Sequence, residues 1–234
     1  IMSDPNAWQM PTYYSRNMHF RLAEPFPDSL NITHNYSQCY QDLFVLSILK
    51  GKRKGTYVEI GSGDPYVSNN TALLEQFDWT GISLEIQESL VDKFNAGRKN
   101  LVACGDATEV DYDDLFTEVG FTNTDFDYLQ VDCEPSEVTF AALKKIPHDK
   151  YRFAVITFEH DSYNDGPAVR DESREFLSGL GYKLVGSNIS VDTGHPYEDW
   201  WVHPELVDME VVNKFINDDE TTKMGEKFVF GDYR

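Results

Sequence analysis

The sequence predicts an α/β fold: a three-layer sandwich with helices on both faces of a mostly parallel, seven-stranded sheet that has one antiparallel strand near its C-terminus. Short apolar runs alternate with segments of helical periodicity between residues 56 and 181. Acids follow five successive apolar runs at intervals of 26, 21, 26 and 27 residues, about one strand, one helix and two short turns. The last third has two strand-like segments without a helix between them, which requires an antiparallel pair.

Five strand–helix units make up the first part of the predicted sheet. Each strand is an apolar run without polar alternation, as expected when helices cover both faces of a parallel sheet. The predicted strands are 56–60, 81–86, 101–105, 126–132 and 151–159. The helices that follow them are expected at 68–77, 88–98, 111–120, 135–146 and 169–181. Another helix, 37–50 with Ser37 as its N-cap, precedes the first strand.

The C-terminal third is expected to close the sheet. Residues 181–190 and 198–203 form the antiparallel pair, and 204–216 form a closing helix. In the second strand, Trp200 and Trp201 alternate, so one faces the core and the other faces either the core or a substrate pocket. The run KFVF near the C-terminus is read as an edge strand or an arm.

The chain is expected to contain one domain, residues 37–216. An irregular N-terminal arm, residues 1–36, precedes it and carries Pro5, Pro11, Pro25 and Pro27 without a sustained period. A charged tail, residues 217–234, follows it. No internal repeat is visible.

The composition restricts the partners and the compartment. A formal net charge of −20 argues against nucleic acid and anionic membranes, since both repel an acidic surface. Nucleic acid and membranes are therefore not expected as partners, and a homodimer through the arm or tail stays open. Three widely spaced cysteines fit buried free thiols better than disulfides or zinc ligands. We find no apolar stretch near the roughly 20 residues of a membrane span and no signal-peptide pattern, so a cytoplasmic protein is expected.

The first candidate site is the turn EIGSGD, which contains Glu59, Gly61, Ser62, Gly63 and Asp64. Glycines between a strand and a helix let a ligand approach the backbone closely. The third glycine of the dinucleotide pattern G-x-G-x-x-G is missing, and two acids beside a pyrophosphate would be repulsive. The acids suit the cationic amino-acid end of S-adenosylmethionine better, although an ordinary tight turn is the alternative.

The other acids continue along the same predicted edge of the sheet. Glu85 at the end of the second strand is placed to accept ribose hydroxyls, which fits NAD and S-adenosylmethionine equally. Asp106 after the third strand would accept the exocyclic amine of adenine, or simply cap a turn. Asp132 and Glu134 after the fourth strand are candidate general bases, with helix capping as the alternative for Glu134.

Glu159, His160 and Asp161 close the fifth strand. Three consecutive ionisable groups at the end of a buried strand are costly unless they are solvated or used. With Asp132, the two carboxylates would form an oxygen-rich Mg²⁺ site, and His160 would act either as a base or as a less usual metal ligand. A polar loop with Asp161 as a turn residue is the alternative.

Several motifs together resemble the FkbM-type methyltransferases, over roughly residues 36–202. They are SQCYQD, YVEIGSGD, SNNTALLE, GISLE, DYLQVDCEPSE and EDWWV, in the order of that family. The resemblance implies a Rossmann-like class I fold, S-adenosylmethionine as methyl donor, and O-methylation of a sugar or another hydroxyl-bearing small molecule. Two departures are Pro65, where the family usually has glycine, and Pro135 in place of the glycine of D-x-E-G-x-E.

The resemblance also implies roles for individual residues. Glu59, Gly61 and Gly63 would contact the methionine part of the cofactor, Glu85 the ribose and Asp106 the adenine, while Asp132 would lie at the site of methyl transfer. Neighbouring positions add to the predicted cofactor contacts Ser62, Asn70, Thr71, Ile86 and Ala107. Two alternatives remain: an NAD(P)-dependent oxidoreductase of Rossmann fold, and a non-catalytic binding module that retains the fold.

Overall fold

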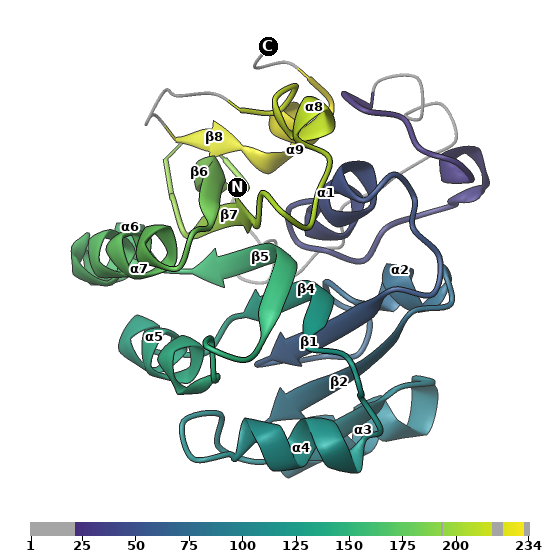
Figure 1. Cartoon of the computed structure of the whole chain (residues 1–234), viewed down its shortest axis with the longest axis vertical. Coiled ribbons are helices and arrows are strands. Elements are labelled where there is room, and N and C mark those ends of the chain that lie inside the picture. The colour runs from purple at the N-terminus through teal and green to yellow at the C-terminus, as the bar shows by residue number, and fades with distance from the viewer. Residues whose placement is uncertain (1–21, 193, 217–221, 232–234) are drawn as a thin grey trace, which may run out of the picture.

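The computed structural model describes residues 22–192, 194–216 and 222–231. Its centre is an eight-stranded sheet in the order β3-β2-β1-β4-β5-β7-β6-β8 (Figure 1). The strands are β1 (Thr56–Ile60), β2 (Thr80–Glu85), β3 (Leu101–Cys104), β4 (Asp125–Val131), β5 (Arg152–Glu159), β6 (Lys183–Ser190), β7 (Glu198–Val202) and β8 (Lys223–Met224).

The sheet is parallel except at one strand. Strands β1 to β5 pair in parallel, whereas β7 runs antiparallel to both of its neighbours, β5 and β6. This is a Rossmann-like α/β fold, with the seven predicted strands in place. The eighth strand, β8, has two residues and pairs in parallel with β6.

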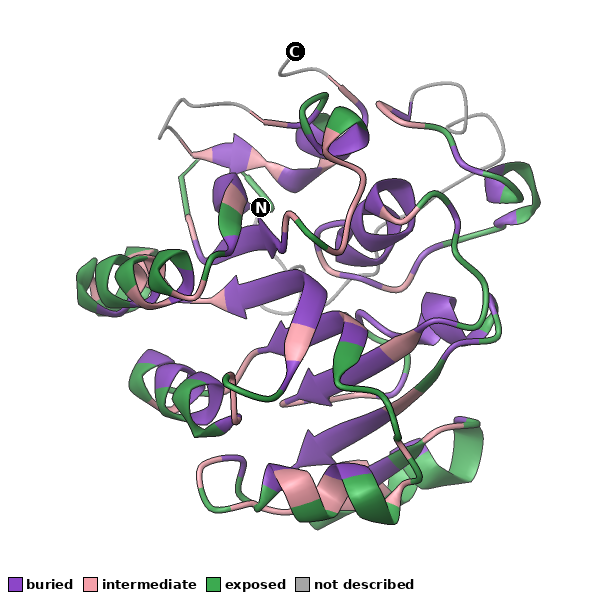
Figure 2. Ribbon diagram, in the orientation of Figure 1, coloured by how far each residue is buried: buried purple, intermediate pink, exposed green. Residues whose placement is uncertain are grey.

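Helices cover both faces of the sheet. They are α1 (Gln41–Ile48), α2 (Ala72–Glu75), α3 (Glu88–Gly97), α4 (Tyr112–Glu118), α5 (Ser136–Lys145), α6 (Ser162–Asp165), α7 (Ala168–Gly179), α8 (Met209–Val212) and α9 (Gly225–Val229), with a 3₁₀ turn at Ser29–Asn31. One apolar cluster joins the sheet to α1, α2, α8 and α9, and a second joins it to α4, α5 and α7. The central strands are buried along most of their length (Figure 2).

The two tryptophans of β7 follow from this layering. Successive residues of a strand point to opposite faces. Trp200 therefore belongs to the first apolar cluster and Trp201 to the second, and each is at most 1% exposed. Both pack in the core, so neither forms a wall of the cavity described below.

Three helices are shorter than the apolar pattern predicts, because polar side chains set where they begin. The carboxamide oxygen of Asn69 accepts hydrogen bonds from the backbone N–H groups of Thr71 and Ala72, and α2 begins there. Ser37 and Asp42 exchange hydrogen bonds, so α1 begins at Gln41 rather than after Ser37. The closing helix is reduced to α8, which Asp208 caps.

The two ends of the described chain pack together on the α1 side of the sheet. Ala23 donates its backbone N–H to the carbonyl of Val229 at 2.9 Å. The run KFVF is helical rather than extended, and it buries Phe228, Val229 and Phe230 against the core. Part of the predicted arm and part of the predicted tail thus belong to the domain, while 1–21, 217–221 and 232–234 lie outside the described residues.

Two smaller expectations concern cysteines and membranes. All three cysteines are free, but only Cys39 is buried, Cys133 is partly buried and Cys104 is exposed. Among the described residues, no helix has the length and apolar character needed to cross a bilayer.

Candidate active site at the carboxyl edge of the sheet

A cavity of about 750 Å³ lies where strands β1 to β4 end. Parallel α/β sheets bind ligands at this edge, at the point where the strand order reverses. Here that point lies at β1, whose neighbours are β2 and β4. Nine predicted site residues line the cavity: Gly61, Ser62, Gly63, Glu85, Ile86, Asp106, Ala107, Asp132 and Glu134.

The two glycines of the turn serve different purposes. Gly61 has φ +76°, and a Cβ added there would lie 1.7 Å from the backbone oxygen of Asp132. Because Gly61 has no side chain, the ends of β1 and β4 can approach each other. Gly63 has φ +59° with no atom within 4 Å of an added Cβ, so it is needed for its left-handed backbone alone.

Glu85 and Asp106 are held by short local contacts. The carboxylate of Glu85 accepts hydrogen bonds from the N–H groups of Gly63 at 2.8 Å and Gln87 at 3.0 Å. This fixes Glu85 between the glycine turn and the end of β2. Asp106 accepts from the hydroxyl and the N–H of Thr108, which lower the pKa of its exposed carboxyl.

Glu59 lies behind the glycine turn and does not line the cavity. Its carboxylate accepts from the hydroxyls of Ser83 at 2.6 Å and Thr71 at 3.0 Å, and from the side-chain amide of Asn69 at 3.2 Å. Burial raises the pKa of Glu59 to about 7, although Arg98 and the hydroxyls oppose this shift. Glu59 thus supports the turn from inside, and Thr71 and Asn70 are also absent from the cavity wall.

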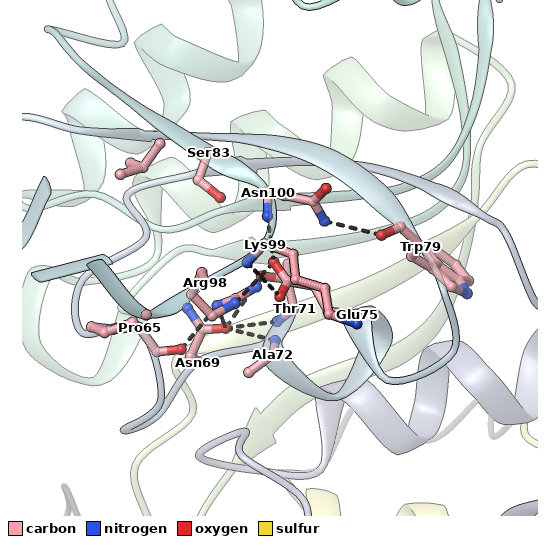
Figure 3. Close-up of polar contacts among 12 residues, drawn as sticks. Pro65, Asn69, Thr71, Ala72, Glu75, Trp79, Ser83, Arg98, Lys99 and Asn100 are labelled. Carbon is pink, nitrogen blue, oxygen red and sulfur yellow. Dashed lines mark hydrogen bonds and ion pairs between the residues drawn. The ribbon is translucent and has the colours of Figure 1, made fainter. Parts of the chain in front are cut away.

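The side chains of Asn69 and Arg98 join the buried groups around Glu59 to the loop that follows β1 (Figure 3). The amide nitrogen of Asn69 also donates to the carbonyls of Ser62 and Asp64, at 3.3 and 3.2 Å. The guanidinium of Arg98 donates to the carbonyl of Pro65 at 2.9 Å and to the side-chain oxygen of Asn69 at 3.1 Å. The loop that follows β1 is therefore held along its length by buried side chains.

Arg98 also balances the charge of a buried carboxylate, that of Glu75. Its side chain is 1% exposed and lies 3.0 Å from the carboxylate of Glu75, whose side chain is 8% exposed. It donates to the hydroxyl of Thr71 at 2.9 Å and stacks over the ring of Phe94 at 4.4 Å. Sequence reasoning missed this residue, because an arginine at the end of an amphipathic helix carries no sign of burial.

A row of three carboxyls crosses the neighbouring strands β4, β5 and β7. Val131 pairs with Phe158, so Asp132 and Glu159 follow on adjacent strands, and Glu159 pairs directly with Glu198. A hydrogen bond joins Asp132 to Glu159. Like charges placed opposite each other in a sheet repel, so such a row retains protons.

The proton affinities follow this arrangement. Burial raises the pKa of Asp132 to about 6 and that of Glu198 to about 8. Burial and then the neighbouring Asp132 raise the pKa of Glu159 well above its usual range. Glu198 accepts hydrogen bonds from Gln41 and the indole of Trp200. It was missed because it opens a strand whose charged start reads as solvent-exposed.

His160 lies away from the cavity, in a second buried polar group. It is fully buried, its Nδ1 accepts from the N–H of Ser162 at 3.1 Å, and its Nε2 lies 3.3 Å from Asp199. Burial would raise the pKa of Asp199, but hydrogen bonds from Arg174 and His160 outweigh it and hold that pKa well below its usual range. This placement does not support the predicted role of His160 as a base, because its ring is turned into the protein.

The predicted metal ligands are not gathered either. Within the described residues, no three His, Cys, Asp or Glu side chains form a group that could hold a metal ion. Asp132 lines the cavity, whereas Glu159 and Asp161 do not. Asp161 has φ +51° and precedes α6, the position of the turn residue in the alternative interpretation.

Several lining residues were not predicted. They include Gln130, a buried polar residue of β4. Asp64, which the predicted turn contains, also lines the cavity and pairs with Lys93. Of the described residues that line the cavity, five are acids and none is Lys, Arg or His. The hydroxyl of Ser62 lines the cavity, is buried, and has no hydrogen-bond partner among the described residues. The cavity therefore favours a ligand that is cationic in part and offers hydrogen-bonding groups.

No protein-family model and no curated protein matches the sequence. The fold is similar to solved structures that include an rRNA methylase from Streptococcus thermophilus (12% identity over 70% of this chain and 93% of that chain, TM-score 0.45). It is also similar to TrmK of M. capricolum in complex with S-adenosyl-homocysteine (13%, 69% and 68%, TM-score 0.46). A third is an O-methyltransferase from Bacillus cereus in complex with S-adenosyl-homocysteine (18%, 70% and 80%, TM-score 0.45). This likeness concerns the fold, so a function must be argued from the cavity itself.

Proposed function

We propose that this protein is an S-adenosylmethionine-dependent methyltransferase that methylates a hydroxyl group of a sugar or another small molecule. The observation that carries the proposal is the long loop after the glycine turn. A pyrophosphate needs a helix N-terminus close to the glycines. Helix α2 instead begins at Ala72, nine residues after Gly63, and acids surround the turn. This arrangement favours a donor with positive charge over a dinucleotide.

The strand ends suggest how the donor would lie. Asp106 and Ala107 after β3, with the exposed side chain of Ile86, would contact the adenine, and Glu85 at the end of β2 would accept the ribose hydroxyls. The glycine turn after β1 would then receive the methionine part. Metal use by Asp132, Glu159 and Asp161 is not part of this proposal, nor does any observation support the FkbM subfamily in particular.

Asp132 is the residue proposed to assist the transfer. The bound cofactor supplies a methyl group on a positively charged sulfur, and the protein must hold a hydroxyl in line with it. Asp132 lines the cavity after β4, and burial raises the pKa of its carboxyl to about 6. At neutral pH it is largely ionised yet more basic than an ordinary aspartate, which suits a general base. Glu134 lines the same wall and is exposed.

Titration calorimetry with S-adenosylhomocysteine tests the proposal. We expect saturable binding, which Glu85→Gln weakens about tenfold by removing a charged acceptor for the ribose. Glu88→Gln on the exposed face of α3 is the matched control, since it removes the same charge outside the cavity. NADH serves as the competing ligand. Absence of heat with S-adenosylhomocysteine at millimolar concentration, or tighter binding of NADH, would overturn the proposal.

A further inference from the structure

We propose that the cavity distinguishes the donor from the product of methyl transfer by charge, binding S-adenosylmethionine more tightly than S-adenosylhomocysteine. Asp132 and Glu134 are the residues assigned to this discrimination. The inference rests on the proposed function, and it adds a property of the same site: product leaves easily and inhibits weakly.

The order of the strands locates the sulfur. Neighbouring strands of a sheet lie about 4.8 Å apart, so the ends of β3, β2, β1 and β4 form a row across the cavity. With adenine at β3 and ribose at β2, the sulfur comes to lie near β1 and β4. The side chains that line the cavity after β4 are Asp132, Cys133 and Glu134. Two of these three are acids.

The charges around this position are unbalanced. Of the five acids that line the cavity, only Asp64 forms an ion pair with a lysine or arginine among the described residues. Glu159 and Glu198 stand behind Asp132 on the next two strands and add no positive charge. A sulfonium placed there is attracted by Asp132 and Glu134, whereas the neutral sulfur of the product gains nothing from them.

The remaining contacts do not discriminate. Donor and product share the adenosine and the amino-acid group, so Glu85, Asp106 and the hydroxyl of Ser62 act on both alike. The difference in affinity therefore depends on the charge of the sulfur and the size of one methyl group. A tenfold preference, about 1.4 kcal/mol, lies below the attraction between a carboxylate and a cation about 4 Å apart near a protein surface.

The test is calorimetric titration of the intact protein at pH about 8. This pH lies above both the ordinary pKa of an aspartate and the raised pKa of Asp132. The probes are S-adenosylmethionine, S-adenosylhomocysteine and sinefungin, which carries an ammonium group in place of the methylated sulfonium. We expect the two cationic probes to bind about tenfold more tightly than S-adenosylhomocysteine. Asp132→Asn should reduce this ratio to about two or three, and Glu134→Gln should reduce it less, because its side chain is more exposed.

Asp149→Asn provides the matched control. Asp149 is exposed in the turn before β5, at the opposite edge of the sheet, so the same loss of charge there should leave the ratio unchanged. If none of the three probes binds, the proposed function itself is wrong. If all bind but S-adenosylhomocysteine binds as tightly as the cationic probes, the proposed function stands and the charge discrimination is wrong. A ratio that survives both cavity substitutions would also overturn it, since the methyl group alone would then be recognised.

Discussion

Replacement of Arg98 by methionine should destabilise the protein strongly. The substitution keeps an unbranched side chain of similar length but removes the guanidinium from a site that is 1% exposed. Glu75 would then keep a buried carboxylate without its partner, and the oxygens of Pro65 and Thr71 would lose donors. Loss of one partner of a buried ion pair costs about 3–5 kcal/mol. We expect a loss of about 4 kcal/mol in the free energy of unfolding, against a total of about 5–15 kcal/mol for a domain.

Urea unfolding followed by tryptophan fluorescence measures this loss. With a slope of about 2 kcal/mol per M, the midpoint should fall by about 2 M. Arg53→Met is the matched control, because Arg53 also pairs with two carboxylates and stacks on a phenylalanine, but on the surface. Its substitution should scarcely move the midpoint. The double variant Arg98→Met/Glu75→Gln should recover part of the loss by removing the stranded charge. Equal midpoints for Arg98→Met and Arg53→Met would refute the reasoning.

Two further predictions concern the glycine turn and the carboxyl row. Gly61→Ala should abolish soluble expression or lower the melting temperature far more than Gly63→Ala, because only the Cβ added at position 61 meets backbone, at 1.7 Å. Gly63→Ala should cost about 1–2 kcal/mol of stability, for its left-handed backbone alone. Equal melting temperatures of the two variants would contradict this. Glu198 has a folded-state pKa of about 8, above its unfolded value, so the folded state binds more protons and stability is lost as pH rises from the range of a free glutamate through about 8. Urea midpoints of the wild type should therefore fall over this range and those of Glu198→Gln should fall less; a parallel decline of the two proteins would show that Glu198 titrates normally.

The strands were predictable because their signal is local. Each of the seven predicted strands lies within two residues of its observed bounds, since buried parallel strands read as uninterrupted apolar runs. Helix starts were less predictable, because α1 and α2 begin where Asp42 and Asn69 engage backbone groups. Such side-chain contacts compete with helical hydrogen bonds and leave no periodic trace in the sequence.

The cavity was predictable in position and less so in detail. Strand ends in a parallel sheet share one edge, so Glu85, Asp106 and Asp132 could be brought together from their spacing alone. The direction in which each side chain points could not be predicted in the same way. Glu59 and His160 also stand at strand ends, yet they turn into the protein because Ser83 and Asp199 offer them partners there. Those partners are 24 and 39 residues away in the sequence, so only the folded chain brings them together.

The position of β7 has a consequence for synthesis and folding of the chain. Strand β7 lies between β5 and β6, both of which precede it in the sequence. Until residues 198–202 have left the ribosome, β5 and β6 each expose an unpaired edge, and that of β5 is the apolar run FAVITF. Unpaired apolar edges are sites of aggregation in nascent and truncated chains. A stop codon before Glu198 would therefore do more than shorten the sheet, because the apolar edge of β5 would stay unpaired and the truncated chain would be prone to aggregation.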